Sequence, residues 1–196
     1  ASYNKKQYTG ELFAEDLCVA SEDVSLDGVE ADPGFHGEGL FNIADSQIKY
    51  GYKLFDKLYP ASTTKLMTAY LAFKYGNMDD IVTVSDSVSS FASDEVVCNL
   101  QPGDTVTLYD LLCGLLLRSG NDCGVAIAEH ISGSVEAFAE LMNSEAKALG
   151  ATGSHFVNPH GLHNENHYTT AYDLYLIFNE AIKYDSFNEI IHMTSY

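Results

Sequence analysis

The stretch from Pro60 to Phe73 constrains this chain most, because a short polar opening runs without a break into a series of apolar residues. Proline suits a chain that enters a helix, and the residues after Lys65 carry apolar side chains at helical spacing. Side chains three positions apart lie on one face of a helix, so Ser62 and Lys65 can touch. We expect a helix over residues 62–75 that carries a nucleophile and its base near its start.

The chemistry of serine explains why this pairing matters. A hydroxyl is a weak nucleophile at neutral pH, and a lysine accepts its proton only if burial or nearby positive charge keeps the amine partly neutral. The helix N-terminus adds free backbone N–H groups, which favour negative charge developing near Ser62. The alternative interpretation is an N-cap serine beside a surface lysine. Three other pairs have the same spacing but do not open an apolar helix: Ser2/Lys5, Ser46/Lys49 and Ser144/Lys147.

Composition excludes some classes of function. With 46% hydrophobic residues, the 196-residue chain can bury a core of its own. Its net charge of −18 repels phosphate backbones, so we expect no nucleic-acid partner. We find no apolar run of about 18 residues and no signal-peptide pattern at the start, so a signal peptide is expected to be absent or removed.

The cysteines leave the redox compartment open. None of the four has Cys-x-x-Cys spacing, and the apolar surroundings of Cys113 and Cys123 predict small core residues. A disulfide that involves these two, Cys18 or Cys98 cannot be assigned from the sequence.

Hydrophobic periodicity divides the chain into a lead-in and one domain. Residues 1–38 have little periodicity and are expected to be extended, with one short strand near 17–20. Residues 39–196 are expected to form the domain, with a hairpin over 40–50 and a helical lobe over about 76–196.

Local signals place the elements of the lobe. The pattern predicts a strand over 81–84, and glycines at 76 and 150 are expected to end helices in the left-handed conformation. Further helices are predicted to begin at Thr107, after the turn at 118–122, at Ser134 and near Thr170.

A second element with chemical groups is the Ser119-Gly120-Asn121 turn between two apolar helices. Glycine allows a sharp turn, the serine hydroxyl can relay a proton, and the asparagine amide offers both a donor and an acceptor. The alternative is an ordinary interhelical turn, because all three residues are common in turns.

Together the two elements are two of the three signatures of penicillin-recognising serine enzymes, the third being Lys-Thr-Gly on a strand. From about residue 40 to 196 the chain resembles the D-alanyl-D-alanine carboxypeptidases, serine-type D,D-peptidases that are low-molecular-mass penicillin-binding proteins. The resemblance implies an α/β, β-lactamase/transpeptidase-like fold with an N-terminal hairpin and a helical lobe. It rests on the stretches 59–69, 116–122, 128–134, 156–162 and 168–174.

The resemblance also implies roles for individual residues. Ser62 would attack the carbonyl between two terminal D-alanines of a peptidoglycan stem peptide, and Lys65 would accept its proton. Ser119 would help return a proton to the leaving D-alanine, while Asn121 would hold Lys65 and the substrate amide.

The family's substrates set the remaining expectations. The loop around His160 and Leu162 resembles the family's substrate-side loop. β-Lactam antibiotics would acylate Ser62 because they resemble the acyl-D-Ala-D-Ala terminus. No cofactor is expected, and the protein would work outside the cytoplasmic membrane, on the cell-wall side.

One departure is the absence of Lys-Thr-Gly from the 196 residues. In the family this motif lies further along, on a strand that supplies the second oxyanion donor, and loss of one such donor costs about 10²–10³ in turnover. We therefore expect that the chain lacks the C-terminal sheet strands and is catalytically incomplete alone. We also expect a C-terminal fragment that carries those strands to pack against it.

Other functions remain open at this point. A β-lactamase or a D,D-endopeptidase would share the Ser62–Lys65 pair, and a non-catalytic relative would only bind wall peptide. A metal site is a further rival, although Pro159 and Gly161 break any helix that could align its ligands. Its candidate ligands are His155, His160, His163 and His167.

Overall fold

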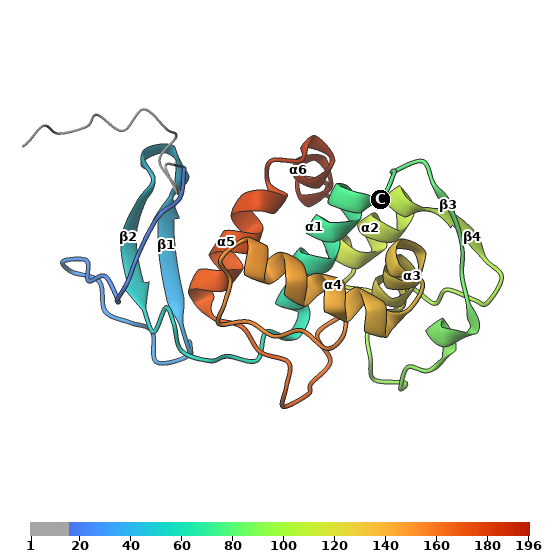
Figure 1. Cartoon of the computed structure of the whole chain (residues 1–196), viewed down its shortest axis with the longest axis horizontal. Helices are drawn as coiled ribbons and strands as arrows, with labels where there is room; N and C mark the ends of the chain where they lie inside the picture. The colour runs from blue at the N-terminus through green and yellow to red at the C-terminus, as the bar shows by residue number, and fades with distance from the viewer. Residues whose placement is uncertain (1–15) are drawn as a thin grey trace, which may run out of the picture.

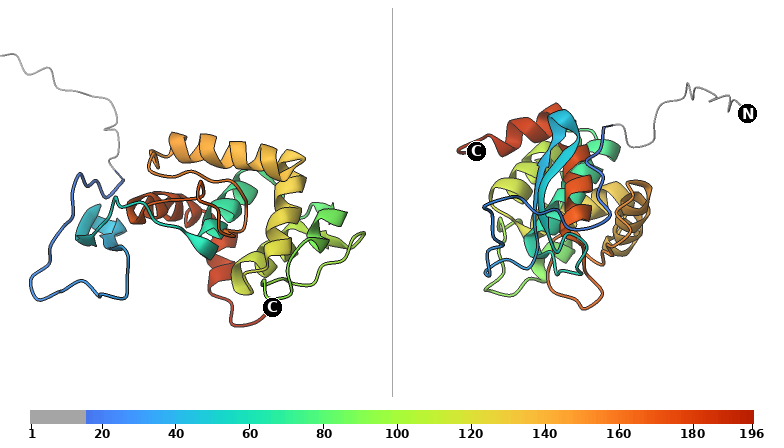
Figure 2. Two further views of the ribbon diagram at one scale, coloured as in Figure 1. Left: turned by 90° about the horizontal axis from the view of Figure 1, so that it is seen from below. Right: turned by 90° about the vertical axis from the view of Figure 1, so that its left-hand side faces the viewer.

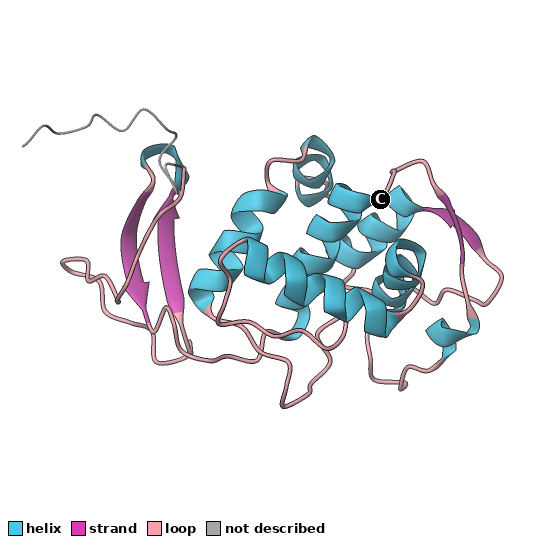
Figure 3. Ribbon diagram, in the orientation of Figure 1, coloured by secondary structure: helices cyan, strands magenta, loops and turns pink. Residues whose placement is uncertain are grey.

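The computed structural model describes residues 16–196, so the first part of the lead-in, with Ser2 and Lys5, lies outside the described residues. Helices form the middle of the molecule, and a small two-stranded sheet lies at each side of them (Figure 3). No helix among the described residues is long and apolar enough to cross a bilayer.

The first sheet is an antiparallel hairpin of β1 (Glu38–Asn42) and β2 (Gln47–Tyr52). A 3-10 turn joins the two strands, and the Asn42 side chain accepts a hydrogen bond from the backbone of Ala44. The hairpin lies beside α5 (Ala171–Ala181) in the views of Figure 1 and Figure 2.

The strand expected near residues 17–20 does not form. The Cys18 backbone N–H instead donates to the Tyr175 hydroxyl at 2.8 Å, and the Cys18 carbonyl accepts from the Tyr172 hydroxyl at 3.0 Å. These bonds to α5 satisfy the backbone groups that a neighbouring strand would otherwise have paired. The lead-in forms a backbone bridge to the hairpin later, between Val24 and Gly51.

The helical lobe is built around α1 (Lys65–Tyr75), whose side chains are buried on nearly every face. A helix that is apolar all round must be covered by neighbours on all sides. Those that contact α1 are α2 (Leu108–Leu117), α3 (Asn121–Ser132), α4 (Val135–Ala148), α5 and α6 (Asp185–Ile191).

The second sheet pairs β3 (Ile81–Thr83) with β4 (Thr105–Thr107), antiparallel. The sequence pattern does not predict strand β4, because Thr107 carries only a helix-cap signal. The structure shows both roles: Thr107 ends β4, and its hydroxyl accepts a hydrogen bond from the Asp110 backbone at the start of α2. The Asp110 carboxylate accepts in return from the Thr107 backbone, so the predicted capping signal is confirmed.

The glycines that follow helices differ in conformation. Gly150 has φ +82°, as expected for a left-handed helix end, but Gly76 is extended with φ −100° and ψ 169°. The prediction for Gly76 is therefore wrong. A Cβ at this position would lie 2.3 Å from the Leu108 side chain, so α2 packs directly on the backbone where α1 ends.

Candidate active site

Ser62 lies in a 3-10 helix (Ala61–Thr64) that leads directly into α1, rather than in an α-helix that begins at residue 62. Ala61 has a left-handed backbone, with φ +48°, which turns the chain sharply before the serine. Ser62 is exposed, whereas Lys65, the first residue of α1, has only 3% of its surface exposed.

The Lys65 amine contacts three oxygen atoms from three separate segments. Its Nζ lies 2.8 Å from Asn121 Oδ1, 2.8 Å from the His160 carbonyl and 3.2 Å from Ser62 Oγ. A neutral amine has two N–H donors and one lone pair. The amide oxygen of Asn121 and the His160 carbonyl can only accept, so they take the two donors and leave the lone pair for the Ser62 hydroxyl.

Burial favours this neutral form of the lysine. Desolvation lowers the pKa of Lys65 to about 8, and the nearby Cys123 thiol opposes that effect. At neutral pH a fraction of the amine is therefore unprotonated and can accept a proton from Ser62.

Ser119 approaches the same hydroxyl from the turn between α2 and α3. Its Oγ donates to Ser62 Oγ at 3.0 Å. Its backbone is left-handed, with φ +65°, a conformation that costs energy in a residue other than glycine and is common at functional sites. Two backbone bonds hold this turn, from Gly120 to the Gly114 carbonyl and from Asn121 to the Val96 carbonyl.

The loop over 158–162 contributes through its backbone. The His160 carbonyl accepts from Lys65, and the Pro159 carbonyl accepts from the Thr68 hydroxyl at 2.6 Å. Gly161 has φ +92°, and a Cβ there would lie 1.7 Å from the Ala61 carbonyl oxygen. Only glycine therefore lets this loop pack against the turn that carries the serine.

His160 and Leu162, the two residues of this loop predicted to bind substrate, have different surroundings. The His160 ring is in edge contact with the Phe91 ring, and desolvation, followed by the charge of Lys65, lowers its pKa to about 4. The Leu162 N–H donates to His160 Nδ1, and its carbonyl accepts from the Asn158 amide. Leu162 does not line the cavity beside Ser62, so its contact with substrate stays a prediction.

That cavity has a volume of about 340 Å³ and opens beside the two serines. Apolar side chains form much of its wall, as is typical of ligand-binding pockets. The lining residues are Ser62, Thr63, Lys65, Leu66, Leu115, Leu116 and Ser119.

The remaining histidines of the rival metal-site interpretation have other neighbours. His155 contacts the Asn166 carbonyl through Nδ1, and His163 lies edge-on to Tyr59. His167 bonds to the Thr64 hydroxyl at 2.7 Å, directly behind the serine turn. Within residues 16–196, the one cluster of three potential metal-binding side chains is instead Cys98, Asp122 and Cys123.

Sequence reasoning singled out Ser62, Lys65, Ser119 and Asn121, and the structure brings these four together. It missed Thr68 and the backbone carbonyl of His160. The glycine at 161 was an available signal for a close backbone approach, although its partner could not be read from the sequence.

Comparisons with known proteins agree over most of the chain. A family model described as D-alanyl-D-alanine carboxypeptidase matches residues 42–196. The D-alanyl-D-alanine carboxypeptidase DacF of Bacillus subtilis is 40% identical over 145 residues, which are 71% of this chain and 37% of the relative. DacC of Escherichia coli is 34% identical over 175 residues, 85% of this chain and 43% of the relative. The chain thus spans roughly two fifths of the length of these two relatives.

Solved structures match in fold as well. The crystal structure of penicillin binding protein 6B from Escherichia coli superposes with a TM-score of 0.73 and 31% sequence identity. The match covers 85% of this chain and 56% of that one. The carboxypeptidase DacD from Francisella tularensis gives a TM-score of 0.74 at 29% identity, over 87% of this chain and 42% of that one.

Proposed function

Because the chain belongs to the D-alanyl-D-alanine carboxypeptidase family and has the fold of penicillin-binding proteins, we propose that it uses Ser62 to remove the terminal D-alanine from peptidoglycan stem peptides. The observation that carries the proposal is the buried Lys65 amine, which lies 3.2 Å from Ser62 Oγ and contacts two further oxygens that can only accept. In its neutral form this amine has a lone pair available for the Ser62 proton. The substrate lies in the cell wall, so the proposed site of action is outside the cytoplasmic membrane.

In the proposed first step, Ser62 Oγ attacks the carbonyl carbon between the two D-alanines while its proton moves to Lys65 Nζ. Negative charge develops on the carbonyl oxygen near the start of α1, where the helix dipole favours it. The carbon–nitrogen bond then breaks, and the leaving D-alanine nitrogen takes the proton back from Lys65 through the Ser119 hydroxyl. The product is an acyl-enzyme on Ser62.

In the second step, water attacks the acyl-enzyme and releases the shortened peptide. Lys65 again accepts a proton, now from the water, and returns it to Ser62 Oγ as the ester bond breaks, while Asn121 holds the amine in place at 2.8 Å. β-Lactams are proposed to acylate Ser62 in the same way. The contribution of a Lys-Thr-Gly strand, supplied by a C-terminal fragment, stays a prediction.

The proposal can be tested by intact-mass analysis after incubation with a penicillin. The protein is purified from the cells that produce it. We expect one covalent adduct, which peptide mapping places on Ser62, and release of D-alanine from a D-Ala-D-Ala peptide. Ser62→Ala should lose both activities. Ser144→Ala is the matched control, because Ser144 and Lys147 have the same spacing but lie exposed on α4.

The outcomes separate the related functions. An adduct that persists in Ser62→Ala would refute the assignment of the nucleophile. Rapid turnover of penicillin would identify a β-lactamase, and cleavage of cross-linked peptides would identify an endopeptidase. Equal peptide binding by wild type and Ser62→Ala, with no D-alanine released by either, would identify a non-catalytic binder.

A further inference from the structure

Two cysteine thiols meet directly behind the Ser119–Asn121 turn. The sulfur atoms of Cys98 and Cys123 and the Asp122 carboxylate lie within 4.8 Å of one another, and both thiols are free. Cys123 lies in the first turn of α3 and is 2% exposed, whereas Cys98 is half-buried in the segment before β4. The proposed reaction uses neither thiol.

Two glycines leave the space that the sulfur atoms fill. A Cβ at Gly114 would lie 2.6 Å from Cys123 Sγ and 3.0 Å from Cys98 Sγ. A Cβ at Gly120 would lie 2.6 Å from Cys98 Sγ and 3.2 Å from Cys123 Sγ. Any larger residue at either position would push the two thiols away, so the local backbone is shaped around the sulfur pair.

The Asp122 carboxylate does not leave its oxygens open for a metal ion. It accepts hydrogen bonds from the Cys98 backbone at 2.8 and 2.9 Å and from the Leu100 backbone at 3.0 Å. It also accepts from the Cys123 backbone at 3.0 Å. The carboxylate therefore holds the two cysteine-bearing segments in register, an arrangement that favours a bond between the cysteines over coordination.

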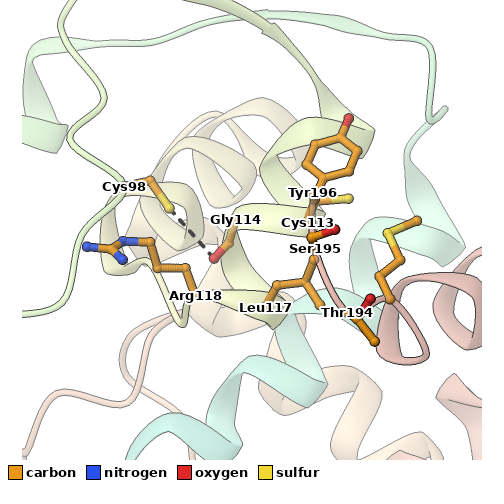
Figure 4. A pocket seen from close by; sticks show the side chains of 9 residues that line it. Cys98, Cys113, Gly114, Leu117, Arg118, Thr194, Ser195 and Tyr196 are labelled. Carbon is orange, nitrogen blue, oxygen red and sulfur yellow. Dashed lines mark hydrogen bonds between the residues drawn. The ribbon is translucent and has the colours of Figure 1, made fainter.

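The two thiols differ in access. Cys98 lines an open cavity of about 600 Å³ together with Arg118 and the segment 194–196, and its Sγ lies 3.7 Å from the Gly114 carbonyl (Figure 4).

The two thiols also differ in pKa. A hydrogen bond from Cys123, with a smaller contribution from the charge of Arg118, lowers the pKa of Cys98. The same hydrogen bond, together with burial, raises the pKa of Cys123. Cys98 is thus the thiol suited to attack, and Cys123 the one suited to resolve.

We propose that Cys98 and Cys123 form a reversible disulfide that joins the segment 96–100 to the start of α3. The Cys98 thiolate attacks an external small-molecule disulfide, forming a mixed disulfide and releasing one thiolate. The Cys123 sulfur then attacks Cys98 and releases the second. Two electrons pass from the cysteines to the external disulfide, and the two cysteine protons go to the released thiolates.

The disulfide would stiffen the neighbouring Ser119 turn of the active site. Asn121 already donates its backbone N–H to the Val96 carbonyl, and Arg118 Nε donates to the Val97 carbonyl, so this segment braces both sides of the Ser119 turn. In the oxidised form a covalent bond would hold this segment against α3, whereas in the reduced form only the hydrogen bonds hold it. This consequence for catalysis rests on the proposed function, but formation of the disulfide does not.

To test this, the full chain is treated with oxidised glutathione, the remaining thiols are alkylated, and the mass of the protein is measured. We expect two of the four thiols to be lost, and a tryptic digest to link peptide 75–118, which holds Cys98, to peptide 119–147, which holds Cys123. Because Cys113 shares the first peptide, Cys113→Ala serves as the control and should keep the link. Cys123→Ser should instead accumulate glutathione on Cys98, and dithiothreitol should reverse every product.

Thermal unfolding supplies a second readout. The oxidised wild type should unfold about 5 °C or more above the reduced form, and Cys98→Ser should show no such difference. Four free thiols after oxidation, a link that is lost in Cys113→Ala, or zinc protection of Cys98 and Cys123 without a linked peptide would overturn the proposal. None of these measurements needs turnover, so they stand apart from acylation of Ser62.

Discussion

Lys65 is the residue on which the proposed chemistry depends, and its burial makes that chemistry dependent on pH. With the pKa at about 8, the unprotonated fraction falls about tenfold for each pH unit below that value. We expect the rate of Ser62 acylation by a penicillin to rise through pH 8 and to level off above it, as measured by stopped-flow or mass spectrometry.

A variant tests whether Lys65 sets this profile. Asn121→Asp places a carboxylate 2.8 Å from the amine, which stabilises the protonated form and moves the midpoint to higher pH. A rate that does not change with pH, or a midpoint that Asn121→Asp leaves in place, would contradict the role of Lys65 as the base.

His167 makes the free energy of unfolding depend on pH. Its Nδ1 accepts from the Val157 N–H at 3.0 Å, so the neutral ring donates through Nε2 to the Thr64 hydroxyl. Burial, followed by the nearby His155, lowers the pKa of His167 from 6.5 to about 4. Between these values the unfolded chain binds more protons, so the free energy of unfolding falls as pH drops from 6.5 to 4, by up to about 3 kcal/mol.

The matching variant is His167→Gln, which keeps an N–H donor for Thr64. We expect it to remove about half of the acid-induced loss measured by urea unfolding, because His160 also has a pKa of about 4. His163→Gln, an exposed control, should leave the loss unchanged. An identical acid dependence in wild type and His167→Gln would refute this account.

At the scale of elements, helix starts depend on side-chain caps. The Thr107 hydroxyl accepts at 3.0 Å from the Asp110 backbone, one of the first-turn N–H groups that have no carbonyl partner within a helix. We expect Thr107→Ala to lower the free energy of unfolding by about 1 kcal/mol. The control is Thr105→Ala, an exposed position of the same strand β4, and an equal loss in both variants would show that the cap is not the cause.

At the scale of the whole molecule, the hairpin is attached to the helical lobe through aromatic rings. Phe41 stacks on Tyr175 of α5 at 4.1 Å between ring centres, with 8° between the planes. We expect Phe41→Ala to raise amide exchange in β1 and β2 by tenfold or more, while exchange in α1 stays unchanged, because the stacking contact is worth about 0.5–1.5 kcal/mol in addition to the apolar area that it buries.

The neighbouring residue provides the control for that experiment. Leu40 lies on the same strand but is 54% exposed, so Leu40→Ala should change exchange little. If Phe41→Ala raised exchange equally in α1, the hairpin and the lobe would have to unfold as one unit.

Much of the site follows from signals within a few residues of each group. The spacing of Ser62 and Lys65, the Ser119–Asn121 turn and the cap at Thr107 depend on neighbours no more than one helical turn away, so the sequence predicts them. The resemblance to the family came from the same short motifs, and the family comparison covers residues 42–196.

The remaining features depend on segments that meet only when the chain folds. Gly76 is extended because α2 packs on it, Cys18 bonds to α5 instead of to a strand, and Cys98 reaches Cys123. The His160 carbonyl on Lys65 belongs to the same group. Periodicity and capping report local backbone preference, whereas burial of Lys65, and with it the lowered pKa, requires atoms brought from distant parts of the chain by packing.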